Sequence, residues 1–276
     1  AELFGRGVAG YRETDVCFSA AKLFFAYGLG NALTFPLSVG ATTILMAERA
    51  TPAAVYQRFR KYRPTVFGGV PTLYASMLAS AELHASGHEH LRLCLSAGEP
   101  LPAPIGQRWR SHFGVDILDG IGSTEMLHIF ISAREDEIRP GATGKPVPGY
   151  EAKIVDDDGR DLPPGEMGRL AVRGPTGCRY LADERQTKFV RNGWNLTGDT
   201  YIMDADGYFW YQARSDDMII SAGYNIAGPD VEAALLTHDA VAECGVVGAP
   251  DDARGMIVKA YVVLRPGVTG DAALVS

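Results

Sequence analysis

Residues 120–125, with the sequence GIGSTE, combine residue types that can bind a phosphate group. The two glycines allow the backbone to approach a ligand closely, and Ser123 and Thr124 offer hydroxyl groups to phosphate oxygens. Glu125 adds a carboxylate, which suits Mg²⁺ together with phosphate oxygens. An ordinary polar loop stays the alternative, because the stretch is neither a dinucleotide-binding fingerprint nor a Walker sequence.

A second candidate ligand group is Asp199, which follows a glycine in the sequence TGD. Short carboxylates at such turns accept ribose hydroxyl groups, although an aspartate that bonds its own turn is the more common arrangement. His128 follows the GSTE segment, so we expect it near the same ligand, with a buried core histidine as the alternative. Ser123 is not set in a GxSxG sequence, which argues against a hydrolase triad.

Metal and disulfide chemistry have little support elsewhere in the chain. His84, His88 and His90 lack the HExxH spacing of a helical zinc site, so we expect a solvated loop there. The cysteines are Cys17, Cys94, Cys178 and Cys244, and none of them forms a CxxC pair. We therefore expect free thiols and a cytoplasmic protein.

Composition narrows the class of protein. The 276 residues are 46% hydrophobic and 21% charged, which predicts a folded chain with a substantial core. The net charge of −7 argues against a nucleic-acid partner, and the basic run at 58–63 is expected to be a solvated helix face. Residues 23–47 carry no charge, but their glycines and proline predict a buried helix and a buried strand rather than a membrane span.

Strand and helix patterns alternate through the first half of the chain. Strands are expected at 42–46, 65–67, 91–95 and 115–118, and helices after the caps Thr51 and Thr72 and at 103–112. This order predicts an α/β fold with a parallel sheet and flanking helices. The loops at 68–72, 97–100 and 119–125 should then meet at the carboxyl edge of the sheet, where such folds bind ligands.

The pattern changes at the turn-rich residues 140–149. A small β-rich subdomain is expected at 146–213, with a hairpin around Asp206 and Gly207. A helix at 229–236 and strands at 242–247 and 258–264 predict the start of a small α+β C-terminal domain. We therefore divide the chain into residues 1–145, 146–213 and 217–276, with a hinge at 214–216.

Four motifs in this order resemble those of the adenylate-forming acyl-CoA synthetase superfamily, over essentially the whole chain. They are SAGEPL at 96–101, DGIGSTE at 119–125, TGD at 197–199 and RSDDMIISAGYNI at 214–226. Within the superfamily, FFAYGLGN at 24–31 and GIGSTEMLHIF at 120–130 are most similar to benzoate-CoA and 2-aminobenzoate-CoA ligases. The stretch SAGYNIAGPDVE at 221–232 favours the 2-aminobenzoate type.

The resemblance implies two half-reactions. A small aromatic carboxylic acid attacks the α-phosphate of Mg²⁺-bound ATP, which gives an acyl-adenylate, and coenzyme A then displaces AMP. It also implies roles for individual residues, and Thr124 and Glu125 would be the catalytic ones. The nucleotide and cofactor contacts would come from Gly98, Glu99, Pro100, Asp119, Gly120, Thr124, Asp199 and Arg214, with Glu125 holding Mg²⁺ and Gly223 lining the coenzyme A tunnel. The acid pocket would be shaped by Ala26, Tyr27, Gly28, Gly122, His128 and Ile129, and Asp216 would be the hinge.

Three departures from the family pattern matter. The glycine-rich phosphate loop should precede residue 1, no match to the catalytic lysine occurs before Ser276, and Ala213 stands where a glycine is usual. We therefore expect a piece of a longer enzyme with little adenylation activity of its own. The alternatives are an adenylating enzyme for another acid, such as a medium-chain acyl-CoA synthetase or a carrier-loading domain, and a non-catalytic nucleotide-binding module. The oligomeric state stays open, a homodimer included.

Overall fold

The computed structural model describes residues 1–83, 87–215, 217–221, 224–251 and 254–270. Asp216, the expected hinge, and Gly223, expected in the coenzyme A tunnel, lie outside these residues, as does His84. None of the helices in the described ranges is long and apolar enough to cross a bilayer.

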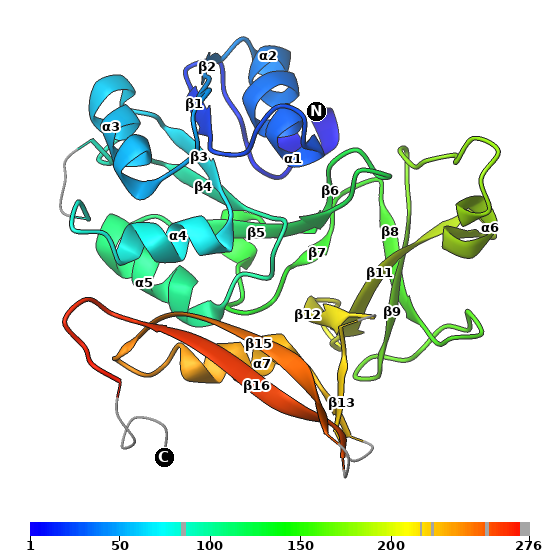
Figure 1. Cartoon of the computed structure of the whole chain (residues 1–276). Coiled ribbons are helices and arrows are strands. Elements are labelled where there is room, and N and C mark those ends of the chain that lie inside the picture. Colours follow the sequence, from blue (N-terminus) through cyan, green and yellow to red (C-terminus); the bar gives the residue numbers. More distant parts are fainter. Residues whose placement is uncertain (84–86, 216, 222–223, 252–253, 271–276) are drawn as a thin grey trace.

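A seven-stranded sheet in the order β2-β1-β3-β4-β5-β6-β7 forms the centre of the first half (Figure 1). The strands are β1 (Val16–Ser19), β2 (Thr42–Ile44), β3 (Val66–Gly69), β4 (Leu93–Ser96), β5 (Ile117–Gly122), β6 (Ile129–Ser132) and β7 (Lys145–Pro146). The first five pair in parallel and the last two antiparallel. The predicted parallel sheet is confirmed, but the sequence reading missed β1, a four-residue strand that is held by partners on both sides.

Helices cover both faces of this sheet because successive strand residues point to opposite sides. Phe18 and Phe67 pack with Tyr56 and Trp109 under α3 (Pro52–Tyr62), α4 (Pro71–Leu78) and α5 (Ala103–Phe113). On the other face Cys17, Val66 and Leu95 pack with residues from the helices η1 (Glu2–Arg6) and α2 (Phe35–Val39).

Two threonines were predicted to cap helices, and the structure confirms one of them. Thr51 caps α3, since its side-chain oxygen accepts a hydrogen bond from the Ala54 amide at 3.3 Å. The prediction that Thr72 caps the next helix is wrong, because α4 begins at Pro71, with Val70 as its cap. The Thr72 amide and hydroxyl instead bind the carboxylate of Glu99, at 3.1 and 3.2 Å. Thr72 therefore ties the loop after β3 to the loop after β4.

The uncharged stretch 23–47 does not form one helix. It folds as α1 (Ala26–Leu29), the π-helix η2 (Gly30–Thr34), α2 and β2. Phe24, Leu37 and Leu45 remain at least 61% exposed, so the expected burial holds only for part of the stretch.

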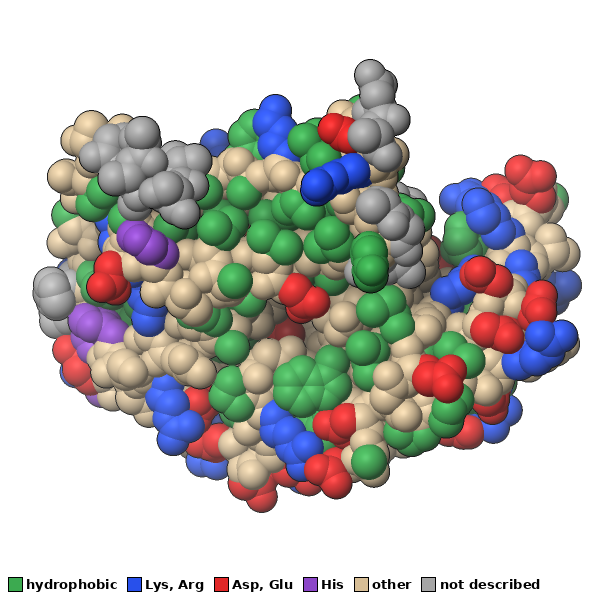
Figure 2. Space-filling model, turned by 90° about the horizontal axis from the view of Figure 1, so that it is seen from below, with side chains coloured by type: hydrophobic (Ala, Val, Ile, Leu, Met, Phe, Trp, Pro, Cys, Tyr) green, Lys and Arg blue, Asp and Glu red, His purple; other side chains and the backbone are tan. Residues whose placement is uncertain are grey.

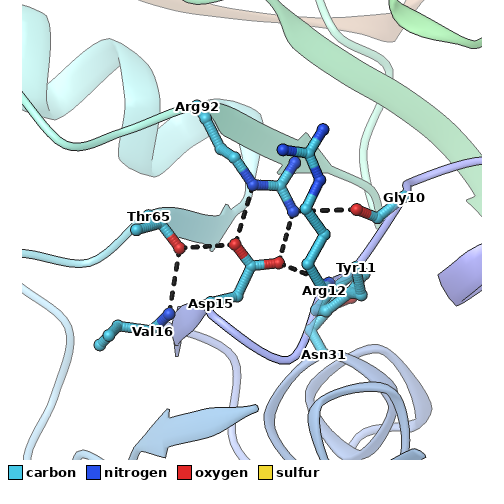
Figure 3. A network of polar contacts seen from close by, with 8 residues as sticks. All are labelled: Gly10, Tyr11, Arg12, Asp15, Val16, Asn31, Thr65 and Arg92. Carbon is cyan, nitrogen blue, oxygen red and sulfur yellow. Dashed lines mark hydrogen bonds and ion pairs between the residues drawn. The ribbon is translucent and has the colours of Figure 1, made fainter. Parts of the chain in front are cut away.

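The amino edge of the sheet is joined by a buried carboxylate (Figure 3). Asp15, 2% exposed, forms an ion pair with Arg92 and accepts a hydrogen bond from the Thr65 hydroxyl at 2.8 Å. Arg92 also donates to the carbonyl oxygen of Gly10 at 2.9 Å. Burial alone would raise the pKa of Asp15, but the hydrogen bonds from Arg92, the Arg12 amide and Thr65 hold it below its ordinary value.

A second, antiparallel sheet follows, with the path β10-β11-β9-β8 and β12 paired to β11. It comprises β8 (Glu151–Val155), β9 (Met167–Arg173), β10 (Val190–Arg191), β11 (Trp194–Met203) and β12 (Phe209–Arg214), with α6 (Arg185–Phe189) before β10. The predicted hairpin is confirmed, and Gly207 in its turn has a φ of 81°.

The last part of the chain contains β13 (Ile219–Ser221), β14 (Tyr224–Ile226), α7 (Gly228–Leu235), β15 (Val241–Asp251) and β16 (Gly255–Leu264). We call α7, β15 and β16 the C-terminal unit. Leu236 and Val241 belong to the same core cluster as Trp109 of α5, so the unit packs against the helices of the first sheet. Figure 2 shows this side of the molecule, with hydrophobic side chains at its surface. On β16, the side chains of Tyr261 and Val263 are exposed. The predicted boundaries at 145, 213 and 217 stay predictions.

Candidate active site

The carboxyl ends of β4 and β5 face the second sheet across a cavity of about 550 Å³. Its lining includes most of the residues expected at the nucleotide, namely Gly98, Glu99, Pro100, Asp119, Gly120, Glu125, Asp199 and Arg214. The loop after β3 does not line the cavity, but its Thr72 holds Glu99. Two of the three loops that the topology brought to this edge therefore form the cavity wall, and the third supports it.

Asp199 and Arg214 are register partners on β11 and β12. Arg214 Nη1 lies 3.1 Å from Asp199 Oδ1 and 3.4 Å from the carbonyl oxygen of Thr197. Gly198, which stands between Thr197 and Asp199 in the sequence, has a φ of 82°. A Cβ added to Gly198 would lie 2.9 Å from Arg214 Nη2. Any other residue at this position would therefore strain the turn and displace the guanidinium of Arg214.

Asp119 lies in β5, at the last position that pairs with β4, and lines two cavities, the 550 Å³ cavity and another of about 130 Å³. Its Oδ1 is buried and has no hydrogen-bond partner among the described residues. Burial is the largest influence on this carboxyl and raises its pKa to about 7. Asp119 is thus an acid with an open bonding position next to the cavity.

The structure brings a segment to the cavity that sequence reasoning missed. Tyr180, Arg185 and Phe189 line it from the stretch before β10, and the Tyr180 hydroxyl donates to Glu125 Oε1 at 3.1 Å. The Arg185 guanidinium lies 4.9 Å from the centre of the Tyr180 ring and pairs with Asp183. No local spacing marks these residues, because their place depends on how the second sheet packs.

The GSTE segment differs in detail from the expected loop. Residues up to Gly122 belong to β5, and a Cβ on Gly122 would lie 2.5 Å from the His128 carbonyl oxygen. Ser123 turns its hydroxyl to the Met126 amide at 3.1 Å. Thr124 is exposed and is not among the lining residues, in contrast to Glu125.

A second cavity of about 380 Å³ holds half of the residues expected around the acid. Ala26, His128 and Ile129 line it together with Phe4 and Phe35, and Met126 lines both this cavity and the larger one. Met126 is 1% exposed, so its side chain forms a wall between the two spaces.

The other three expected acid-pocket residues do not line this second cavity. The Tyr27 hydroxyl donates to the carbonyl oxygens of Gly69 and Leu95 at 3.0 and 2.9 Å, at the ends of β3 and β4. Gly28 packs on the backbone of Lys22, because a Cβ there would lie 2.1 Å from the Lys22 carbonyl oxygen. Gly122 lines the larger cavity.

His128 is held as a neutral side chain. Burial lowers its pKa to about 4, and its Nε2 lies 3.3 Å from the carbonyl oxygen of Tyr27, to which it donates. Its Nδ1 is buried without a partner among the described residues. The Tyr27 ring stacks on the imidazole at 5.8 Å between centroids.

The sequence matches two known protein families. Residues 3–180 match the family described as AMP-binding enzyme, and residues 230–276 match the AMP-binding enzyme C-terminal domain. The chain belongs to the AMP-binding enzyme family.

The relatives and solved structures that the chain resembles include aryl-CoA ligases. It is 51% identical to the benzoate–CoA ligase of Thauera aromatica, over 99% of this chain and 53% of the relative. It is 45% identical to the 4-hydroxybenzoate–CoA/benzoate–CoA ligase of Rhodopseudomonas palustris, over 96% of this chain and 49% of the relative. The chain thus spans about half the length of the curated relatives it matches.

Solved structures agree with the fold. An anthranilate CoA ligase in complex with anthranoyl-AMP superposes with a TM-score of 0.96 at 43% identity, over 99% of this chain and 54% of that one. A benzoate CoA ligase from Burkholderia xenovorans gives a TM-score of 0.91 at 48% identity, over 99% and 55% of the two chains.

Proposed function

We propose that this chain belongs to an AMP-forming aryl-CoA ligase, which activates a small aromatic carboxylic acid of the benzoate or 2-aminobenzoate type. The main support for this function is the pair of neighbouring cavities that share Met126. The larger one has a mixed lining with Asp199 and Arg214 in its wall, and the smaller one is lined mainly by apolar and aromatic groups. A nucleotide and an aromatic acid need these two environments side by side.

In the first half-reaction, a carboxylate oxygen of the acid forms a bond to the α-phosphorus of ATP, and the bond to the β-phosphate oxygen breaks. Pyrophosphate leaves, and the acyl-adenylate remains. Asp199 and Arg214 would bind the ribose hydroxyls, while Gly98, Glu99 and Pro100 would pack along the adenine. Asp119 and Gly120 would lie beside the base and the sugar, and Thr124 would contact the α-phosphate.

The residues present fit a magnesium ion held mainly by phosphates. No group of three His, Cys, Asp or Glu side chains lies together in the described part of the chain, but Mg²⁺ bound to a nucleotide needs only one or two carboxylates. Glu125 faces the cavity and would supply one. The ion would offset phosphate charge, and Tyr180 would orient Glu125 toward it.

In the second half-reaction, the sulfur of coenzyme A would attack the acyl carbon, the bond from that carbon to AMP would break, and the thiol proton would be released. Gly223 and the hinge residue Asp216 are proposed for this step on the family resemblance. The acid would lie in the smaller cavity, against Ala26, His128 and Ile129. Tyr27, Gly28 and Gly122 would shape its border. A cytoplasmic location accords with four free cysteines.

Calorimetric titration of this chain with AMP and with stable acyl-adenylate analogues tests the proposal. We expect saturable AMP binding that Asp199→Ala weakens by at least about tenfold, because an aspartate that binds ribose makes charge-assisted hydrogen bonds. Asp206→Ala, on the exposed hairpin turn, is the matched control and should bind as the unchanged chain does. Equal affinity in all three proteins would exclude the cavity as the nucleotide site.

The acyl part is tested with benzoyl, 2-aminobenzoyl and octanoyl analogues. Tighter binding of the two aryl compounds supports an aryl-CoA ligase, since the smaller cavity is only about 380 Å³ and is lined by aromatic rings. Preference for octanoyl would contradict the aryl assignment while leaving adenylate binding intact.

A further inference from the structure

A shallow cavity of about 620 Å³, open to solvent, lies where the C-terminal unit meets the helices of the first sheet. Its walls come from α4, α5 and Leu83 on one side, and from the loop between α7 and β15 and the residue after β16 on the other. It has no lining residue in common with the candidate active-site cavity. The contact region between the C-terminal unit and these helices, which we call the joint, therefore contains a cavity that is separate from the candidate active site.

The base of this joint is apolar. Leu78 and Leu236 line the cavity and belong to the core cluster that also contains Trp109 and Val241. Charges placed on such a surface are partly removed from water, so their interactions are stronger than on an open surface.

The charged part of the lining is mainly positive. Arg108 comes from α5 and Arg265 follows β16, and both are half-buried. Neither forms an ion pair within the ranges that the structure describes, although Arg265 Nε donates to the Val241 carbonyl oxygen at 3.3 Å. Asp239 is an acidic side chain of this lining, and it is exposed.

The positive charges of Arg108 and Arg265 repel each other. Burial lowers the pKa of Arg108, and the positive charge of Arg265 lowers it further. Two like charges from separate elements thus share one partly buried space, which is unfavourable unless a negative charge lies between them.

We propose that this cavity binds a phosphate-type oxyanion, with Arg108 and Arg265 as its main ligands. The planar donor fork of arginine matches phosphate oxygens. Gln107 lines the same cavity, and its side-chain amide can donate a further hydrogen bond. The hydroxyl groups of Ser111 and Thr237 also line it, but they donate to the carbonyl oxygens of Gln107 and Ala234. An anion here contacts α5 and the C-terminal unit together, so its binding stabilises the orientation of the unit seen in the structure.

Titration calorimetry with the whole chain tests the site, with chloride replaced by inorganic phosphate or pyrophosphate at constant ionic strength. We expect saturable binding that Arg108→Gln and Arg265→Gln each weaken by at least about tenfold. Arg110→Gln is the matched control, because Arg110 lies on the same helix and pairs with Asp116 at 3.1 Å. Comparison of the two anions shows whether the site favours a single phosphate or a diphosphate.

Thermal unfolding gives a second readout. A hundredfold excess of anion over its Kd should raise the Tm of the unchanged chain and of Arg110→Gln by about 5 °C, but leave the two site variants nearly unchanged. The absence of saturable binding, or an equal response of all four proteins, would overturn the site. Equal weakening by Arg110→Gln would show a general attraction to basic charge and would overturn it as well.

Discussion

The hydroxyl of Tyr180 donates a hydrogen bond to Oε1 of Glu125 at 3.1 Å, across 55 residues of sequence. Glu125 follows the strand β5, whereas Tyr180 lies on the segment that leads from β9 to α6. The contact therefore connects the two sheets at the rim of the larger cavity.

Tyr180→Phe should weaken the Mg²⁺-dependent part of ATP binding by about tenfold, because a hydrogen bond to a charged group contributes roughly 1.5–3 kcal/mol. AMP binding without Mg²⁺ should not change. Calorimetry with both nucleotides measures the difference, and Tyr62→Phe, at an exposed position on α3, is the control. An equal loss of AMP affinity would mean that Tyr180 shapes the cavity instead of orienting Glu125.

Gly198→Ala should displace Arg214 and weaken AMP binding by about tenfold, since the new methyl group would lie 2.9 Å from its Nη2. Gly207→Ala places the same strain on a φ of 81°, with no atom within 4 Å of the new Cβ. Both variants should lose similar stability, and only Gly198→Ala should lose AMP affinity. If the two variants bind AMP alike, Arg214 does not contact the nucleotide.

Asp119→Asn should change how stability depends on pH. The carboxyl has a pKa of about 7 in the folded chain, above the unfolded value of 3.8, so the folded state retains a proton that the unfolded state releases. Stability therefore falls as the pH rises from about 4 to about 7. Between pH 5 and pH 8 the unchanged chain should lose about 2.5 kcal/mol relative to the variant, as measured by denaturant unfolding. A constant difference between the two proteins would contradict this assignment.

Arg92→Ala should lower the free energy of unfolding by about 3 kcal/mol, because it leaves the carboxylate of Asp15 buried without its cation. Arg160→Ala removes an exposed ion pair with Asp158 and should cost less than about 1 kcal/mol. Denaturant unfolding at pH 7 measures both. Equal effects would show that the Asp15 network does not hold the amino edge of the sheet.

Met126→Ala should join the two cavities and weaken the selection for small acyl groups. A naphthoyl-adenylate analogue should gain affinity relative to the benzoyl analogue by about tenfold, as expected when one wall of a hydrophobic pocket is removed. Met126→Leu keeps the volume and should retain the preference. An unchanged ratio of affinities in Met126→Ala would place the acid outside the smaller cavity.

The sequence by itself predicted most of the alternation of strands and helices in the first half of the chain, though not β1, and two of the loops that line the larger cavity. Alternation of apolar strands with capped helices predicts a parallel sheet, and a parallel sheet brings the loops at Gly98 and Asp119 to one edge whatever the details of packing. The turn at Asp206 and Gly207 was equally readable, because hairpin turns depend on the local backbone.

Only the tertiary structure decided which side chains reach the ligand space. Glu125 lines the larger cavity whereas the neighbouring Thr124 does not, and Tyr27 binds the ends of β3 and β4 while Ala26 lines the smaller cavity. The side chains of neighbouring residues therefore have different contacts, because strand register and packing decide which of them lines a cavity. Tyr180, Arg185 and Arg265 reach their cavities from other elements, so contacts between distant segments decide their positions, which no local pattern records.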